Sequence, residues 1–240
     1  MAETQSSAPI LEALANHARQ SSVSFGVPGH KSGQGAPPDI KQVIGADAFA
    51  SDATTQKGID DRRETKRTIQ RAERLAAEAW GADVAYLSTN GTSLSNHAAF
   101  LSAAAPGDTV LVARNCHKSV AAGLILAGLR PVFLEPDHDE VWDIEHGIPL
   151  SELERKLAAH PEAKGAFVVS PTYFGVVGNI AALAECCHRR GKPLVVDEAW
   201  GRTWPSTRTC RRTRSRPAPT SRSAASIRPR RGSRAPRSCC

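Results

Sequence analysis

Three short motifs place polar side chains where a catalytic site would need them. Gly91, Thr92 and Ser93 lie in STNGTSLSN between an apolar run and a helical pattern, His117 lies in RNCHKS, and Asp197 lies in VVDEAWG. A helix start that also carries hydroxyl groups suits a phosphate. An imidazole stacks on aromatic rings and moves protons near neutral pH. A carboxylate at the end of a buried strand needs a cationic or donating partner.

Each motif also has a plainer interpretation when it is taken alone. Ser and Thr commonly cap helices, and a single loop histidine usually has no chemical role. The partner of Asp197 is a protonated cofactor ring, a magnesium ion or a backbone cap. Ser170 and Thr172 in SPTYFG are further candidates at a strand end. The cysteines lack zinc-finger spacing, so no metal site is predicted.

Alternating elements are expected to position these side chains. Apolar periodicity predicts helices over 65–80, 92–104, 119–128, 151–159 and 180–190, and strands over 84–87, 109–113, 131–134, 166–170 and 193–197. Ser151 is the expected N-cap of its helix. Short apolar strands that alternate with helices indicate a parallel α/β sheet covered on both faces, with ligands beyond the carboxyl ends of the strands. Residues 25–39, rich in Gly and Pro, predict an extended arm.

The order of the motifs resembles one known family. Residues 25–201 are similar to the Orn/Lys/Arg decarboxylases, which are fold-type-I enzymes dependent on pyridoxal phosphate. The similar segments are PGHKSGQG, AERLAAEAWGAD, LSTNGTSLSNHAAF, PGDTVLVARNCHKSVAAGLILAG, SPTYFGVVGNI and VVDEAWG. The resemblance implies an aspartate-aminotransferase-like large domain with a mainly parallel sheet between helices, incomplete at its C-terminus.

The resemblance also assigns roles. Pyridoxal 5′-phosphate would be the cofactor, with Thr92 and Ser93 holding its phosphate at the Gly91 turn. His117 would stack on the pyridine ring, and Asp197 would pair with the ring nitrogen and deepen the electron sink. The implied reaction removes the α-carboxylate of arginine, lysine or ornithine.

Further expectations concern partners and location. By the same resemblance, Thr172 would lie near the polar edge of the cofactor ring. The substrate would be an amino acid. A homodimer or higher homo-oligomer is expected for the intact family member. The alternative is another fold-type-I enzyme, such as an aminotransferase or a lyase. The PGHK and NCHKS motifs argue against it, because they belong to the decarboxylase pattern. The start of the sequence shows no signal-peptide pattern and no run of about 18 apolar residues appears, so a cytoplasmic protein without a membrane span is expected.

Composition separates a basic tail (202–240) from the rest of the chain. Before the tail we expect an N-terminal helix and Gly/Pro-rich arm (1–60), followed by the partial pyridoxal-phosphate-binding large domain that the resemblance implies (61–201). The tail holds 12 of the 31 Lys and Arg residues and none of the 24 Asp and Glu residues. Its composition predicts no fold. A non-catalytic protein whose tail binds nucleic acid through arginines is a third hypothesis, which we consider weaker because the tail has a more detailed explanation.

That explanation begins with a missing lysine. The family binds its cofactor as a Schiff base to a Ser-x-His-Lys lysine, and no such motif follows Asp197. Lys118 and Lys192 do not occupy the family position. Read one base out of frame with permitted synonymous codons, residues 203–229 give HLAFHPDLPEDAVTPGADLSIGSIHKT, in which Ser-Ile-His-Lys lies under residues 225–228. We hypothesise a frame shift near residues 201–202, and the chain as written is expected to be inactive.

Overall fold

The computed structural model describes residues 4–20, 25–54, 59 and 67–201. The predicted basic tail at 202–240 lies outside the described residues. The chain divides into two compact units. We call residues Met1–Ala79 with Val84–Leu87 the N-terminal unit, and Trp80–Asp83 with Ser88–Cys240 the sheet unit.

The regular elements in the described part of the N-terminal unit are helices. Its helices are α1 (Pro9–Arg19), α2 (Pro38–Ile44), α3 (Ala46–Ser51) and most of α4 (Thr68–Trp80). The predicted Gly/Pro-rich arm forms no regular element before α2, but it is not extended. Its backbone makes successive turns, with Lys31 N–H donating to Pro28 O and Gly35 N–H to His30 O. The His30 ring then contacts Asp52 at 3.0 Å and the edge of Phe49, so the turns pack on α3.

The sheet unit contains the predicted parallel sheet. Its strands are β1 (Thr109–Ala113), β2 (Arg130–Leu134), β5 (Ala166–Val169) and β6 (Leu194–Asp197). They lie in the order β2-β1-β5-β6, and each neighbouring pair is parallel. Four of the five predicted strands are therefore confirmed to within one residue at each end.

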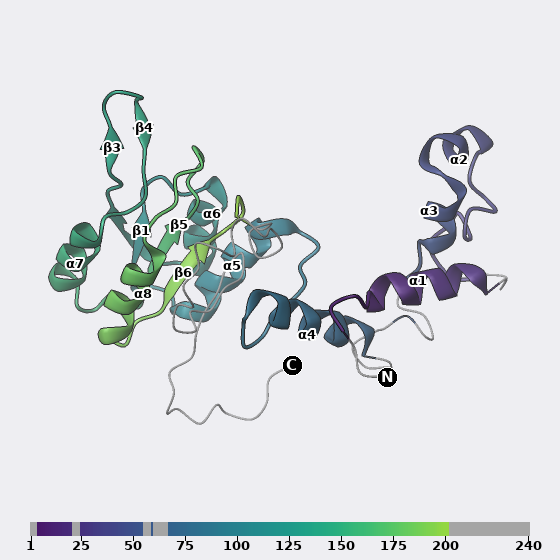
Figure 1. The fold of residues 1–240 in the computed structure, drawn as a ribbon, viewed down its shortest axis with the longest axis horizontal. Helices are drawn as coiled ribbons and strands as arrows, with labels where there is room; N and C mark the ends of the chain where they lie inside the picture. Colours follow the sequence, from purple (N-terminus) through teal and green to yellow (C-terminus); the bar gives the residue numbers. More distant parts are fainter. Residues whose placement is uncertain (1–3, 21–24, 55–58, 60–66, 202–240) are drawn as a thin grey trace. The chain divides into compact units, whose positions relative to one another are not determined.

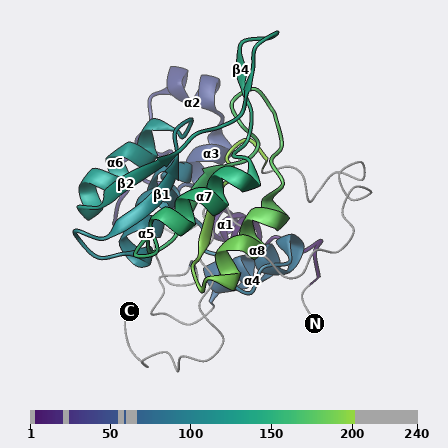
Figure 2. The same cartoon turned by 90° about the vertical axis from the view of Figure 1, so that its left-hand side faces the viewer.

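Helices cover both faces of this sheet, as predicted. They are α5 (Gly91–Ala103) and α6 (Lys118–Ala127) on one face, and α7 (Leu150–Ala159) and α8 (Ile180–Arg189) on the other; Figure 2 shows the two pairs on opposite sides of the strands. Side chains of a strand alternate between faces. Accordingly Val110 and Val112 of β1 pack with α5 and α6, whereas Leu111 and Ala113 pack with α7 and α8.

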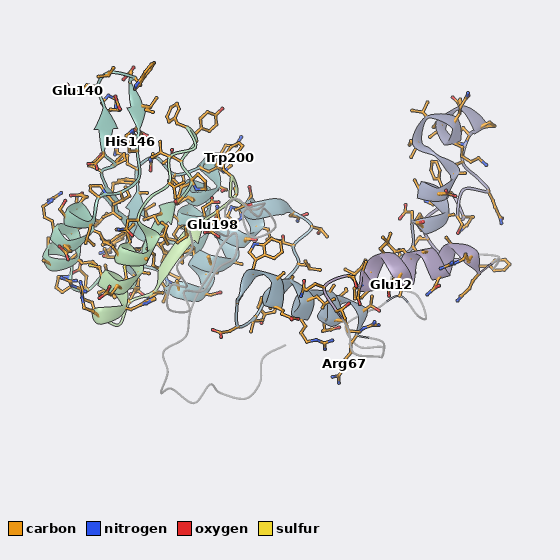
Figure 3. The ribbon with its side chains drawn as sticks, viewed as in Figure 1. Glu12, Arg67, Glu140, His146, Glu198 and Trp200 are labelled. Atoms are coloured by element: carbon orange, nitrogen blue, oxygen red, sulfur yellow. The ribbon has the colours of Figure 1, made fainter. Side chains whose placement is uncertain are left out.

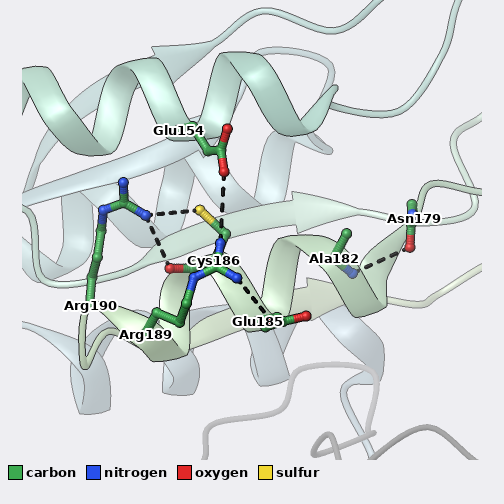
Figure 4. Close-up of polar contacts among 7 residues, drawn as sticks. All are labelled: Glu154, Asn179, Ala182, Glu185, Cys186, Arg189 and Arg190. Carbon is green, nitrogen blue, oxygen red and sulfur yellow. Dashed lines mark hydrogen bonds and ion pairs between the residues drawn. The ribbon is translucent and has the colours of Figure 1, made fainter.

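The face covered by α7 and α8 is apolar throughout its core. Leu153, Cys186 and Cys187 are wholly buried there, and burial raises the pKa of the Cys187 thiol to about 12. Charges remain at the rim, where Arg190 Nη1 donates to Cys186 O and Arg189 bridges Glu185 and Glu154 (Figure 4). The charged side chains therefore do not interrupt the apolar packing.

The face covered by α5 and α6 contains a stacked pair of aromatic rings and a close contact between the two helices. Phe100 of α5 stacks on Phe167 of β5, with ring centroids 3.9 Å apart and planes inclined by 16°. A Cβ atom on Gly123 of α6 would lie 2.8 Å from Phe100 Cδ2 and 3.3 Å from His97 Cδ2. Glycine is therefore required where these two helices touch.

Three features differ from the sequence predictions. Residues 84–87 form no strand, and the side chains of Val84 and Tyr86 are 59% and 77% exposed. Ser151 is not the N-cap of α7, because that helix begins at Leu150 with Pro149 at the cap. An antiparallel hairpin of β3 (His138–Asp139) and β4 (Ile144–Glu145) was not expected, and it projects beyond the end of the sheet (Figure 1).

Candidate functional site

Asp197 is the last residue of β6 and lies at the carboxyl edge of the sheet. Its side chain is 6% exposed, and both of its oxygens accept hydrogen bonds. Oδ2 accepts from Asn96 Nδ2 at 2.8 Å, and Oδ1 accepts from the Ala199 backbone N–H at 3.0 Å. A carboxylate has about four lone-pair positions, so the Asp197 carboxylate is partnered and still able to accept further hydrogen bonds.

His117 lies at the N-cap of α6, just after β1. Its Nδ1 atom accepts from the Ser119 backbone N–H at 3.2 Å and lies 2.8 Å from Ser119 Oγ. Ser119 Oγ in turn accepts from Asn96 Nδ2 at 3.0 Å. The structure therefore connects His117 to Asp197 through two buried side chains, although the predicted residues themselves do not touch.

Gly91, Thr92 and Ser93 form the first turn of α5. Gly91 has a φ of 66°, a left-handed conformation that glycine adopts without strain. The N-cap is Asn90, whose side chain makes no capping hydrogen bond. Thr92 and Ser93 are therefore not the N-cap, and they stand beside first-turn amides that have no acceptor within the helix.

Thr172 and Ser170 hold the loop that follows β5. The Thr172 side chain is 2% exposed, and its Oγ1 accepts from the Val176 N–H at 3.3 Å. Ser170 Oγ accepts from the Gly178 N–H at 3.1 Å, and the Ser170 backbone N–H donates to Asp197 O at 3.1 Å. Both hydroxyl groups are therefore used to shape the loop beside Asp197.

Asn96 was missed in the sequence analysis. Asn96, Ala99 and Phe100 are the buried residues of α5, and their spacing of three and four residues marks one helical face. A polar residue on an otherwise apolar face is a signal for a specific buried hydrogen bond. With Asp197, Asn96 lines a small pocket whose other residues are Cys116, Val120, Phe167, Val168, Val169 and Val195.

Cys116 contributes a thiol to this pocket, but not a reactive one. Burial is the main cause that raises its pKa, and the nearby Asp197 charge raises it further. A thiol with a raised pKa holds little of the nucleophilic thiolate at neutral pH. Cys116 is therefore a lining residue.

The two lysines considered as substitutes are placed differently. Lys192 precedes β6 and so lies at the opposite edge of the sheet from Asp197. Its Nζ atom donates to the backbone oxygens of Pro161 and Ala163, and burial lowers its pKa. Lys118 is the first residue of α6 and is exposed.

Aromatic side chains stand just beyond the strand ends. Glu198 and Trp200 come shortly after the end of β6 and are labelled in Figure 3. The Trp200 ring packs edge-on against the Tyr173 ring, with ring centroids 5.7 Å apart. Tyr173 also meets Phe174 edge-on at 5.8 Å. All three side chains are more than half exposed, so an aromatic rim borders the site.

Metal-binding clusters and membrane-spanning helices are both absent from the described residues. Their His, Cys, Asp and Glu side chains form no group of three or more that would hold a metal ion. None of the helices in these residues combines the length and the apolar character that crossing a membrane requires.

Comparison with known families identifies the domain that contains these residues. Residues 8–204 match the major domain of the Orn/Lys/Arg decarboxylases. The chain belongs to this family. The matched range includes Gly91, His117 and Asp197, so each of the three motifs lies within the family's domain.

Its relatives are longer proteins. The arginine decarboxylase of Halalkalibacterium halodurans is 39% identical over 197 residues, which are 82% of this chain and 40% of that one. The Bacillus subtilis arginine decarboxylase is 38% identical over 198 residues, with the same coverage. Among solved structures, lysine decarboxylase A from Pseudomonas aeruginosa aligns with a TM-score of 0.70 at 31% identity, covering 82% of this chain and 29% of that one. The chain thus spans 40% or less of these relatives.

Proposed function

We propose that this chain supplies the cofactor-binding part of an enzyme that decarboxylates arginine, lysine or ornithine with pyridoxal 5′-phosphate. The main support is the buried Asp197 carboxylate, which ends β6, keeps free lone pairs and is joined to His117 by hydrogen bonds. Membership of the family and the names of its relatives support the substrate class. The aminotransferase alternative lacks comparable support.

The residues present suit this cofactor chemically. A phosphate would accept hydrogen bonds from the first-turn amides of α5 and from the Thr92 and Ser93 hydroxyls. The exposed His117 ring is available to lie against a flat heterocycle. Asp197 would accept a hydrogen bond from a protonated ring nitrogen and hold the proton there, because an ionised acceptor favours the charged form of its partner.

Bound pyridoxal phosphate supplies a ring that accepts the electron pair left behind when a carboxylate departs. The protein would orient that ring by the contacts just described. Asn96 and the Ala199 N–H keep the Asp197 carboxylate in one position. The aromatic rim of Tyr173, Phe174 and Trp200 would limit the access of water to the site.

Binding is tested by titrating the purified chain with pyridoxal phosphate and following cofactor absorbance and tryptophan fluorescence. Asp197→Asn is expected to weaken binding at least tenfold, or about 1.4 kcal/mol, because a neutral amide does not stabilise the positive charge of a protonated ring nitrogen. Asp108→Asn is the matched control, since Asp108 precedes β1 at the opposite edge of the sheet. Equal affinities for the wild type and Asp197→Asn would refute the assigned role.

Catalysis is tested by restoring the reading frame near residues 201–202. We expect the chain as written to release no carbon dioxide from the three amino acids above the rate with free cofactor, because no lysine follows Lys192 in the sequence. The frame-restored protein, with Ser-Ile-His-Lys, is expected to be active. Inactivity of a folded, cofactor-loaded, frame-restored protein would contradict the decarboxylase proposal.

A further inference from the structure

A chain of four hydrogen-bonded side chains runs through the site. His117 Nδ1 lies 2.8 Å from Ser119 Oγ, Ser119 Oγ lies 3.0 Å from Asn96 Nδ2, and Asn96 Nδ2 lies 2.8 Å from Asp197 Oδ2. Asn96, Ser119 and Asp197 are only 3%, 6% and 6% exposed. Leaving one of these buried groups unpaired is costly, so their hydrogen atoms must be arranged to satisfy every bond.

The direction of the chain is fixed at Asn96. An ionised carboxylate only accepts hydrogen bonds, so the amide group facing Asp197 at 2.8 Å must be the NH₂ group. The flipped amide would place two acceptors against each other. The two hydrogens of the Asn96 NH₂ group are then both used, one toward Asp197 and the other toward Ser119.

The direction continues through Ser119. Its hydroxyl oxygen accepts from Asn96, so its single hydrogen is free to donate to His117 Nδ1 at 2.8 Å. The Ser119 backbone N–H donates to the same Nδ1 atom at 3.2 Å. A ring nitrogen that accepts hydrogen bonds carries no hydrogen of its own. The neutral imidazole therefore carries its proton on Nε2.

We propose that Asn96 is a positioning residue, which acts through Ser119 to hold His117 in the Nε2–H tautomer and to tie the orientation of its ring to the Asp197 carboxylate. The tautomer follows from the hydrogen bonds alone. The consequence for cofactor binding rests on the proposed function, in which His117 and Asp197 contact the same ring. Asn96 then fixes two cofactor contacts at once without touching the cofactor.

The tautomer is measured by NMR on the full chain with ring-¹⁵N histidine and without cofactor. His117→Gln identifies the His117 signals by their loss. In the wild type, Nδ1 is expected to have a pyridine-type and Nε2 a pyrrole-type chemical shift. A pyrrole-type Nδ1, or signals averaged between the two tautomers, would overturn the proposal.

Asn96→Asp tests the direction of the chain with little change of shape. The new carboxyl group faces Asp197, where two ionised carboxylates would repel each other, so the pair keeps one shared proton. Its oxygen then accepts from the Ser119 hydroxyl, which turns toward it and leaves the Ser119 oxygen as an acceptor for His117. The Nδ1–H tautomer is expected to rise to a measurable fraction of the neutral population, and the Ser119 backbone N–H, which the substitution leaves in place, keeps it below half. Asn179→Asp is the matched control, because Asn179 caps α8 through Ala182 (Figure 4) and aspartate caps equally well.

Ser119→Ala tests whether the effect passes through the hydroxyl. Alone, it is expected to admit a measurable fraction of the Nδ1–H tautomer, and in its presence Asn96→Asp should cause no further change. An Asn96→Asp effect that persists without the hydroxyl would show a through-space charge effect and overturn the relay. Backbone amide spectra show whether each variant is folded. If Asn96→Asp does not fold, the His117 tautomer measured in the wild type and in Ser119→Ala still tests the proposal.

The outcomes separate this inference from the proposed function. If the wild type has the Nε2–H tautomer but does not bind pyridoxal phosphate, the relay stands and the cofactor assignment fails. If the cofactor binds and the tautomer is wrong, the relay fails alone. If both hold, Asn96→Asp is expected to weaken cofactor binding at least tenfold, whereas Asn179→Asp leaves it unchanged.

Discussion

The two faces of the sheet use the same four strands for different purposes. Behind α7 and α8 the core is an apolar cluster of Leu, Ala, Val, Ile and Cys side chains. Behind α5 and α6 an apolar cluster that includes Phe100 and Phe167 adjoins the polar chain from His117 to Asp197. One face therefore contributes mainly stability, and the other also fixes the direction of specific hydrogen bonds.

The difference matters because the two kinds of core tolerate change differently. When side-chain volume is removed from an apolar core, the free energy of unfolding falls in proportion to the size of the cavity. A buried polar chain fails when a single donor becomes an acceptor, even if the shape is kept. Substitutions on the two faces should therefore separate stability from site geometry.

The largest effect on stability is expected from Leu153→Ala on the α7–α8 face. Leu153 is wholly buried, so the loss should be about 2–5 kcal/mol, with the His117 tautomer unchanged. Urea unfolding followed through amide signals of β1 and β5 reports on the sheet unit. Leu150→Ala on the same helix, where Leu150 is 37% exposed, is the control and should cost far less. Similar losses for both variants would contradict the assignment of this face.

An intermediate effect is expected from Gly123→Ala on the α5–α6 face. The added methyl group would lie 2.8 Å from the Phe100 ring, which is stacked on Phe167 and has no room to withdraw. Overpacking of about 1–3 kcal/mol exceeds the roughly 1 kcal/mol gained in helix propensity. The same unfolding measurement should show a net loss. A second substitution, Phe100→Leu, should recover part of the unfolding free energy that Gly123→Ala loses. If the losses of the two single variants simply add in the double variant, the contact between Gly123 and Phe100 is not the cause.

The effect that is smallest at neutral pH is the pH dependence carried by Cys187, because it develops only above about pH 9. Its pKa is raised from 9.0 to about 12 in the folded chain, chiefly by burial. The folded state therefore holds the thiol proton more tightly, and this contribution is complete below pH 9 and is lost as the pH rises toward 12. Over that range the stability difference between the wild type and Cys187→Ala should narrow. A difference that stays constant would show that the thiol ionises equally in both states.

Much of the sheet was predictable because its strands are short, almost wholly apolar and separated by helices. The run at 84–87 is equally apolar and was wrongly predicted as a strand. Periodicity reports side-chain character but not whether a neighbouring strand is available, and in the described part of the chain none pairs with these residues. The β3–β4 hairpin shows the converse, because its mixed sequence HDEVWDIE carries no clear alternation.

The site divides in a similar way. The positions of Gly91, His117 and Asp197 after apolar runs were sufficient to place them at strand or helix ends. Asn96 and Ser119 were not assigned, because their role depends on contacts between α5, α6 and β6 that sequence spacing does not encode. Thr172 remains a predicted cofactor contact, although its hydroxyl already accepts a hydrogen bond from its own loop.

The bond between Asn96 and Asp197 joins residues 101 positions apart. On a ribosome that adds about 5–20 residues per second, α5 would emerge roughly 5–20 seconds before the carboxylate that satisfies its buried amide is synthesised. During that interval the nascent chain can pair β1 with β2 but cannot complete the polar core. Completion of the polar chain on this face of the sheet is therefore timed by the synthesis of β6.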